Sequence, residues 1–203
     1  MRVILASQSK ARKELMDTLK IEYEIIVSHA EELLEEKLTI QEQAEKLACL
    51  KGKTVFDQTE GDRIVIGSDT MLCKDNILYG KPKNEKQAIQ FLNEFSGQKI
   101  QVITGLAIYV YQQGKEQQFI SSDIANIYFK EMDQQDIRRI LEKDNPYDGA
   151  GAYKIEGFAG ALTQKIEGNY ATVLGLSIHH VYDILKKYQI FNQKDIDRNH
   201  KKC

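Results

Sequence analysis

Four clusters of polar side chains interrupt the apolar pattern of this 203-residue chain, and each contains groups that can hold phosphate or a metal ion. The first cluster follows the apolar run Val3–Ala6 and consists of Ser7, Ser9, Lys10 and Arg12. Unpaired N–H groups at the start of a helix bind anions. The sequence therefore predicts an anion site where this strand runs into a helix. The alternative is a helix capped by serine, with solvated cations beside it.

The second and third clusters contain Asp69 and Lys81. Asp69 follows the apolar run Ile64–Ile66, which predicts a short buried strand that ends just before this aspartate. An ionised carboxylate that leaves a buried strand needs a partner, a metal or a water-filled cleft, and open α/β sheets bind ligands at strand ends. Lys81, in a Gly-Lys-Pro sequence, can reach a phosphate as a point charge. The alternatives are a turn aspartate and a solvated loop lysine.

The fourth cluster joins the pair Glu31-Glu32 to Lys51, which interrupts the apolar face of an expected helix. This lysine either extends its charged end to solvent or projects into a cleft. Mg²⁺ usually binds one or two carboxylates together with substrate phosphates, and Lys and Arg neutralise the remaining charge. The four clusters favour phosphoanhydride chemistry on a nucleotide over a serine-nucleophile mechanism, because no histidine is placed to activate a serine.

Composition and missing motifs exclude several other classes of protein. The net charge is −2, so no overall basic field attracts a nucleic acid polymer. No apolar run approaches the roughly 18 residues of a membrane span, and Val3–Ala6 is too short for the apolar part of a signal peptide. Cys49, Cys73 and Cys203 are widely spaced and odd in number, which predicts free thiols in a reducing, cytoplasmic compartment.

Histidine offers no evident metal site at this level. His179 and His180 are adjacent on a predicted helix, where neighbouring side chains point about 100° apart. We therefore expect that they do not share a metal ion.

Alternating helix and strand patterns predict an α/β fold with a mixed β-sheet and flanking helices. The long β-rich runs 99–111 and 117–129 are expected to form a hairpin and a second lobe. Capping residues predict helix starts at Ser7 or Ser9, Thr39, Asn84 and Asp133. Helical spacing of apolar residues predicts a final helix over residues 177–188. Other expected strands cover residues 3–6, 23–27, 64–66, 71–73 and 77–79. We expect one bilobal domain over residues 1–190 and a polar C-terminal tail over residues 191–203.

The clusters belong to an ordered series of short motifs that resembles the Maf family of nucleotide pyrophosphatases. No single motif is specific, but order and spacing agree from about residue 3 to residue 188. The motifs are Leu5–Arg12, Gly67–Thr70, Gly80–Pro82, Ser96-Gly97, Val102–Gly105, Gly149–Tyr153, Ile155–Gly157, Ile166–Gly168 and Val173–Leu176. The resemblance implies hydrolysis of a nucleoside triphosphate to the monophosphate and pyrophosphate, with Mg²⁺ or Mn²⁺ as cofactor, as house-cleaning of nucleotide pools.

The same resemblance implies a structure and residue roles. It implies a deep central cleft between two lobes, related to the inosine triphosphatase architecture, and a homodimer. Matched by position, Asp69 is the catalytic carboxylate, and Glu32 is a second acidic residue that we expect to bind the metal together with Asp69. Arg12 and Lys81 match phosphate-binding cations. Ser7 and Lys51 match polar positions of the cleft.

Three positions that divide substrates within the family disagree in this chain. Ala11 stands where the UTP/dTTP group usually has Arg, whereas Thr70 resembles that group. Glu156 stands where that group has Gln and resembles the group that acts on methylated GTP. A carboxylate accepts hydrogen bonds only, so Glu156 favours a base edge that offers donors, as guanine or cytosine does. Two further departures are Lys10, where the family usually has Pro, and Gly149, where Lys is frequent.

A function of another class remains open at this level. The chain could be a non-catalytic nucleotide-binding regulator of cell division or septum formation. The presence of both Asp69 and Glu32 argues against it, because binding alone would not need both carboxylates.

Overall fold

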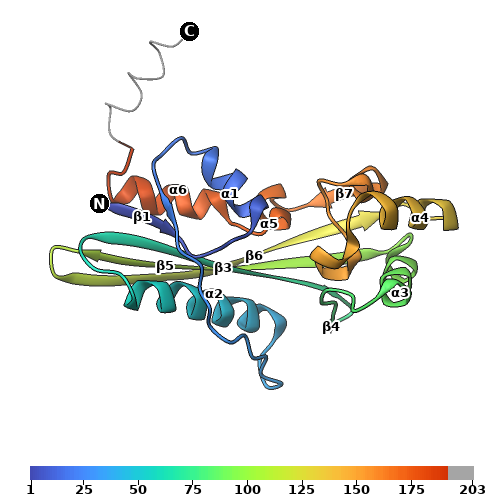
Figure 1. Ribbon diagram of the computed structural model, residues 1–203, viewed down its shortest axis with the longest axis horizontal. Helices are drawn as coiled ribbons and strands as arrows, with labels where there is room; N and C mark the ends of the chain where they lie inside the picture. Colours follow the sequence, from blue (N-terminus) through green and yellow to red (C-terminus); the bar gives the residue numbers. More distant parts are fainter. Residues whose placement is uncertain (192–203) are drawn as a thin grey trace, which may run out of the picture.

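A seven-stranded mixed sheet runs through the computed structural model, which describes residues 1–191 (Figure 1). The strand order is β2-β1-β3-β5-β6-β7, and β4 pairs with the far end of β3. β1 pairs in parallel with β2 and β3, and every other pairing is antiparallel. The strands are β1 (Arg2–Leu5), β2 (Glu24–Ile25), β3 (Arg63–Lys74), β4 (Ile77–Leu78), β5 (Lys99–Gln112), β6 (Lys115–Phe129) and β7 (Thr163–Glu167). The predicted fold class, α/β with a mixed sheet and flanking helices, is confirmed.

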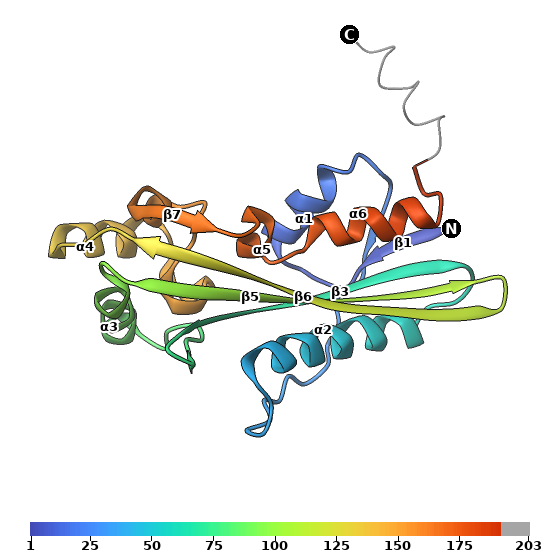
Figure 2. The same cartoon turned by 180° about the vertical axis from the view of Figure 1, so that it is seen from behind.

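Helices cover both faces of this sheet. One face carries α2, and the other carries α1, α5 and α6, while α3 and α4 lie at the far end of the sheet, where α4 is near β7 (Figures 1 and 2). The helices are α1 (Lys10–Asp17), α2 (Ile40–Asp57), α3 (Glu85–Phe95), α4 (Gln134–Lys143), α5 (Tyr170–Leu174) and α6 (Ile178–Lys187). Short 3₁₀ turns cover Pro146–Asp148, Ala150–Ala152 and Phe158–Leu162. None of the helices within residues 1–191 is long and apolar enough to cross a membrane.

Capping side chains begin the helices where the sequence predicts. Ser9 caps α1 by accepting from the N–H of Arg12, and Thr39 and Asp133 form complete capping boxes at α2 and α4. Each such cap satisfies N–H groups that the helix itself leaves unpaired. Asn84 caps α3 by accepting from the N–H of Gln87, whereas the Gln87 side chain accepts from the N–H of Lys83, so a capping box is only half formed.

The predicted end of a strand before Asp69 is wrong. β3 continues through Asp69 to Lys74, because β5 pairs with it without interruption from Arg63 opposite Tyr111 to Cys73 opposite Gln101. Backbone pairing with a long neighbour outweighs the polar sequence Gly-Ser-Asp, since ladder hydrogen bonds do not depend on side-chain polarity. Asp69 therefore lies within a strand and not in a turn.

The predicted long hairpin forms, and it belongs to the same sheet as β3. β5 and β6 pair with each other along their whole length, and β5 pairs with β3, so they are the centre of the one sheet. The strand predicted over residues 23–27 shortens to Glu24–Ile25, which pairs only with the end of β1. Most of the tail predicted over residues 191–203, with Cys203, lies outside the described residues.

Candidate active site

A cavity of ≈ 930 Å³ opens where β1 stops and β3 continues. The last residue of β1, Leu5, pairs with Ile66, and β4 rejoins the same edge of β3 only at Cys73. In the described part of the chain, no strand covers this edge between those two points. A cavity of this size suits a nucleotide-sized ligand. Its lining includes all nine residues predicted from the sequence: Ser7, Ala11, Arg12, Glu32, Lys51, Asp69, Thr70, Lys81 and Glu156.

Lys51 joins the two predicted acidic residues of the site. Its Nζ lies 2.6 Å from Oδ1 of Asp69 and 3.0 Å from Oε2 of Glu32. Lys51 extends from α2 toward β3, and its side chain is only 15% exposed, so it projects into the cleft and not to solvent. Asp69 is buried, whereas Glu32 is half exposed. The Lys51 ammonium therefore keeps one oxygen of Asp69 and one oxygen of Glu32 close together.

Arg12 is held by three neutral acceptors. Its Nε donates to the carbonyl of Gly175 at 2.7 Å, Nη1 donates to Oγ of Ser7 at 3.3 Å, and Nη2 donates to Oγ1 of Thr70 at 3.0 Å. Burial lowers the pKa of the Arg12 guanidinium, and the charges of Asp69 and Glu32 raise it. An arginine stays protonated in either case, so a fixed positive charge faces the cavity.

The N-terminus of α1 adds backbone donors to the same wall of the cavity. Oγ of Ser7 accepts from the N–H of Ser9, and Oγ of Ser9 accepts from the N–H of Arg12. Within residues 1–191, no partner is recorded for the N–H groups of Lys10 and Ala11, which both line the cavity. These groups, with the positive end of the helix dipole, suit an anionic ligand.

Residues after β4 and from the segment before β7 complete the lining of the cavity, and the two segments meet where the N–H of Gly151 donates to the carbonyl of Gly80. Lys81 and Glu156 are both exposed and line the cavity. Lys154 also lines it and is paired with Asp148 at 3.5 Å. Tyr153 is buried beside them, and burial raises the pKa of its hydroxyl.

Several residues that hold the site together were not predicted. Oγ of Ser68 donates to the carbonyl of Gly175 at 2.9 Å, and Oγ1 of Thr104 lies 3.1 Å from Oγ1 of Thr70. Gly175 has a φ of 96°, and a Cβ there would meet Oγ1 of Thr70 at 2.8 Å, so its backbone can approach Arg12 only as glycine. These residues fall in the motifs Gly67–Thr70, Val102–Gly105 and Val173–Leu176, but their order in the chain does not reveal the contacts.

The donor set at Asp69 and Glu32 fits the predicted divalent metal. Mg²⁺ and Mn²⁺ prefer carboxylate and phosphate oxygens. The side chains of Asp69 and Glu32 both reach one cation, Lys51, which shows that a single positive charge can contact both. A carboxylate pair beside an anion-binding wall is the arrangement in which a metal binds mainly through substrate phosphates.

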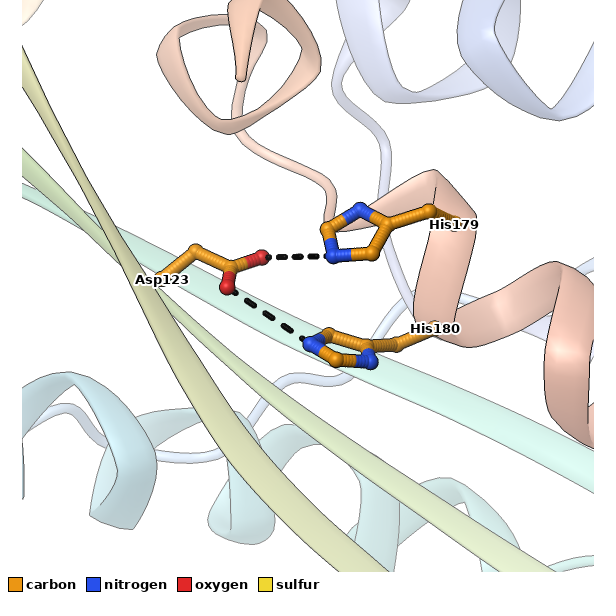
Figure 3. Close-up of side chains that lie close together, drawn as sticks. All are labelled: Asp123, His179 and His180. Carbon is orange, nitrogen blue, oxygen red and sulfur yellow. Dashed lines mark ion pairs between the residues drawn. The ribbon is translucent and has the colours of Figure 1, made fainter. Parts of the chain in front are cut away.

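The expectation that the side chains of His179 and His180 diverge is wrong, whereas the prediction that they do not share a metal ion stays a prediction. Their ring centroids lie 4.1 Å apart, and Nε2 of each ring lies 3.5 Å from an oxygen of Asp123 (Figure 3). Both histidines are in the first turn of α6. Rotation about the side-chain bonds brings the two rings together, although the Cα–Cβ bonds diverge by the helical angle.

Fold and cavity together define an α/β protein with a cleft in which several cations lie beside two carboxylates. The profile of the Maf-like protein family matches residues 2–188. The chain therefore belongs to the Maf family.

Curated relatives match over nearly their whole length. The chain is 39% identical over 186 residues to a dTTP/UTP pyrophosphatase of Alkaliphilus oremlandii, covering 92% of this chain and 95% of that protein. It is 37% identical over 191 residues to a dTTP/UTP pyrophosphatase of Aquifex aeolicus, covering 94% of this chain and 97% of that protein. A solved structure of a nucleoside-triphosphatase / dITP/XTP pyrophosphatase from Mycobacterium abscessus matches with a TM-score of 0.40 and 13% identity, over 64% of this chain and 74% of that one.

Proposed function

We propose that this chain hydrolyses a nucleoside triphosphate to the monophosphate and pyrophosphate, with Asp69 activating the attacking water. The observation that supports this most is that cations from four different elements or loops, at Arg12, Lys51, Lys81 and Lys154, line one cavity with Asp69 and Glu32. A triphosphate needs several cations, and its hydrolysis needs a base. Membership of the Maf family and relatives named as pyrophosphatases support the same activity.

Phosphate binding is assigned to the wall formed by Arg12 and the start of α1. A guanidinium has five N–H donors, and three of those of Arg12 contact Gly175, Ser7 and Thr70. Two donors remain for a phosphate. Lys81, which lines the same cavity, supplies a second positive charge for the bound anion.

Asp69 is the base in this proposal because one of its oxygens is already held. Lys51 contacts Oδ1 at 2.6 Å, which leaves Oδ2 to accept the proton of a water molecule. The water attacks the α-phosphorus, and pyrophosphate leaves toward Arg12 and Lys81. When bound by Asp69 and Glu32, Mg²⁺ or Mn²⁺ would supply further neutralisation of the phosphate charge.

The experiment is a pyrophosphate-release assay with a panel of nucleoside triphosphates, with and without Mg²⁺ or Mn²⁺. General-base catalysis contributes about 10²- to 10⁴-fold, so we expect Asp69→Asn to lower kcat by at least about 10²-fold. Asp57→Asn, the same change at the exposed end of α2, is the control and should keep the parent rate. Release at the parent rate by Asp69→Asn would remove Asp69 from the mechanism. No release from any triphosphate by the parent would instead favour a non-catalytic regulator.

Base selection is assigned to Glu156, together with Ala11 and Thr70. Glu156 lines the same cavity from the segment before β7, and we place the base beside it while the phosphates face the start of α1. A glutamate accepts from the exocyclic amino group of cytosine, whereas the corresponding position of thymine or uracil is an acceptor. We therefore propose that bases with an amino edge are favoured over dTTP and UTP, the substrates named for the relatives. Thr70 contributes indirectly, since its hydroxyl contacts Arg12.

Cytoplasmic location, a homodimer and the absence of nucleic acid and membrane partners stay part of this proposal. Free thiols at Cys49 and Cys73 are consistent with a reducing compartment. The homodimer rests on the family resemblance alone, and light scattering of the purified protein would test it.

A further inference from the structure

Asp123, His179 and His180 form a second polar cluster, outside the nucleotide cavity (Figure 3). Asp123 lies on β6, and the two histidines begin α6, so the cluster joins a strand to a helix that packs across it. One ligand atom from each residue lies within 4.8 Å of the others. We propose that this cluster binds a divalent transition metal of the Zn²⁺ class, independently of the metal expected at Asp69.

The distances suit a metal ion better than hydrogen bonds. Nε2 of His179 lies 3.5 Å from Oδ2 of Asp123, and Nε2 of His180 lies 3.5 Å from Oδ1. N–H···O hydrogen bonds are usually about 2.7–3.2 Å long. Two ligand atoms bound to one tetrahedral Zn²⁺ at about 2.0–2.1 Å lie roughly 3.4 Å apart. The separation of each imidazole nitrogen from its nearest oxygen of Asp123 is therefore close to the distance between two ligands of one ion.

The carboxylate lacks the partner that its burial requires. Oδ2 of Asp123 is buried and has no hydrogen-bond partner within residues 1–191. A buried charged oxygen without a partner is costly, and a bound cation removes that cost. His179 and His180 are each about 40% exposed, at 43% and 40%, so an ion and its water ligands can enter from solvent.

The chemistry of the ligands selects the class of metal. Two imidazoles and one carboxylate suit Zn²⁺, Co²⁺ or Ni²⁺, whereas Mg²⁺ prefers oxygen ligands. Zn²⁺ sites with two histidines and one carboxylate leave a fourth position for water. The histidine cluster should therefore prefer Zn²⁺, and the Asp69–Glu32 pair should prefer Mg²⁺. Excess Mg²⁺ should not displace Zn²⁺ from the histidines.

Among the described residues, the amide of Asn169 opposes metal binding by His179. Its Oδ1 accepts from the N–H of Ala171 at 2.9 Å, so its amide nitrogen faces Nδ1 of His179 at 3.2 Å. That amide donates to Nδ1, which places the ring hydrogen of neutral His179 on Nε2. A metal on Nε2 needs the hydrogen on Nδ1, facing an acceptor. Asn169→Asp would supply that acceptor and keep the helix cap, because Asp caps helices as well as Asn does.

The bound ion would also stabilise the segments whose residues hydrogen-bond to Arg12. His179 and His180 follow Gly175 closely, and the carbonyl of Gly175 accepts from Arg12. Asp123 pairs with Thr104 in the next strand, and Thr104 contacts Thr70, a second partner of Arg12. An ion that ties β6 to α6 thus lies beside the residues that fix Arg12, and it should raise the thermal unfolding midpoint.

The test is a calorimetric titration of the full chain with Zn²⁺, and in parallel with Co²⁺, in excess Mg²⁺ to occupy the oxygen site. We expect one Zn²⁺ per chain. His180→Ala and Asp123→Asn should each weaken binding at least about tenfold, since loss of even an outer partner costs about 10- to 100-fold. Asn169→Asp should tighten binding about tenfold for the same reason. Zn²⁺ should raise the thermal midpoint of the parent but not of His180→Ala.

Controls separate this site from other metal ligands and from unfolding. His29→Ala, and a chain with Cys203→Ser and His200→Gln, should bind Zn²⁺ as the parent does. His180→Gln repeats the ligand loss with a side chain of similar size, and midpoints in EDTA must match the parent for each variant. The proposal is overturned by no Zn²⁺ uptake, by uptake unchanged in both His180→Ala and Asp123→Asn, or by weaker binding in Asn169→Asp.

Discussion

At the scale of single residues, hydrogen bonds within the protein orient the guanidinium of Arg12 before any ligand binds. Three neutral acceptors use three of its donors, and no carboxylate lies within ion-pair distance of it in the described residues. Its charge is therefore not neutralised by a direct partner. Since a guanidinium binds phosphate oxygens in pairs, the two remaining donors are suited to one phosphate group.

Arg12→Lys tests whether this geometry matters beyond the charge. A lysine keeps the positive charge but cannot contact Gly175, Ser7 and Thr70 together and still reach the ligand. Loss of one charge-assisted hydrogen bond costs about 1.5–3 kcal/mol, so kcat/KM for pyrophosphate release should fall about 10- to 150-fold. Arg2→Lys, at an exposed arginine paired with Glu24, is the matched control. An unchanged kcat/KM in Arg12→Lys would reduce its role to that of a simple charge.

Glu156→Gln tests base selection at the same scale. The amide can donate to the acceptor oxygen of uracil or thymine, which the carboxylate cannot. A well-formed contact to a base edge is worth about 1–3 kcal/mol. The ratio of kcat/KM for UTP to that for CTP should therefore rise by about 5- to 150-fold in Glu156→Gln. Competition assays with both nucleotides measure this ratio directly, and Glu131→Gln, an exposed position outside the cavity, should leave it unchanged. A constant ratio in Glu156→Gln would exclude Glu156 from base recognition.

At the scale of elements, the approach of α2 to the sheet decides where Lys51 ends. A Cβ on Gly105 of β5 would overlap the carbonyl oxygen of Ala44, and one on Gly67 of β3 would overlap that of Ala48. These glycines let the helix backbone lie directly against the strands. Lys51, one turn after Leu47, consequently reaches Asp69 across a short gap.

Gly105→Ala should separate α2 from the sheet. An added methyl group in a closely packed contact costs about 1–3 kcal/mol, so the free energy of unfolding in urea should fall by about that amount. Activity should fall as well, because Lys51 moves away from Asp69. Gly80→Ala is the control for stability, since a Cβ at Gly80 meets no atom within 4 Å. Equal urea midpoints for Gly105→Ala and the parent would show that the helix can shift without cost.

How far the sequence predicts this structure depends on the kind of signal. Caps such as Thr39 with Glu42 are local, so helix starts were predicted well. The length of β3 was predicted poorly, because β3 pairs with residues of β5 that are about 30 positions or more away in the chain. All nine predicted residues line one cavity, yet the contacts of Gly175 with Arg12 and Ser68 span more than 100 positions. The sequence did not mark Asp123 as a possible metal ligand, since a single carboxylate in a β-rich run is typical of an exposed strand face.

At the scale of the whole molecule, one sheet joins apolar clusters that lie at opposite ends. One cluster, around α3 and α4, includes Val102 of β5, and the cluster under α1 and α6 includes Leu106 of the same strand. Leu72 and Ile66 of β3 divide between the two clusters in the same way. Because β3 and β5 are shared, neither end can lose its strands without disturbing the other. The nucleotide cavity takes residues from both ends.

This sharing predicts that the two ends unfold together. The chain has no tryptophan, so Phe91→Trp at the α3 end and Phe119→Trp at the α6 end would each report one end by fluorescence. For each variant, the urea midpoint from tryptophan fluorescence should equal the urea midpoint from circular dichroism, as in a two-state transition. This outcome would support the single domain over residues 1–190. A fluorescence transition that precedes loss of circular dichroism at one end alone would mean that this end unfolds independently, and that the shared strands do not couple the two clusters.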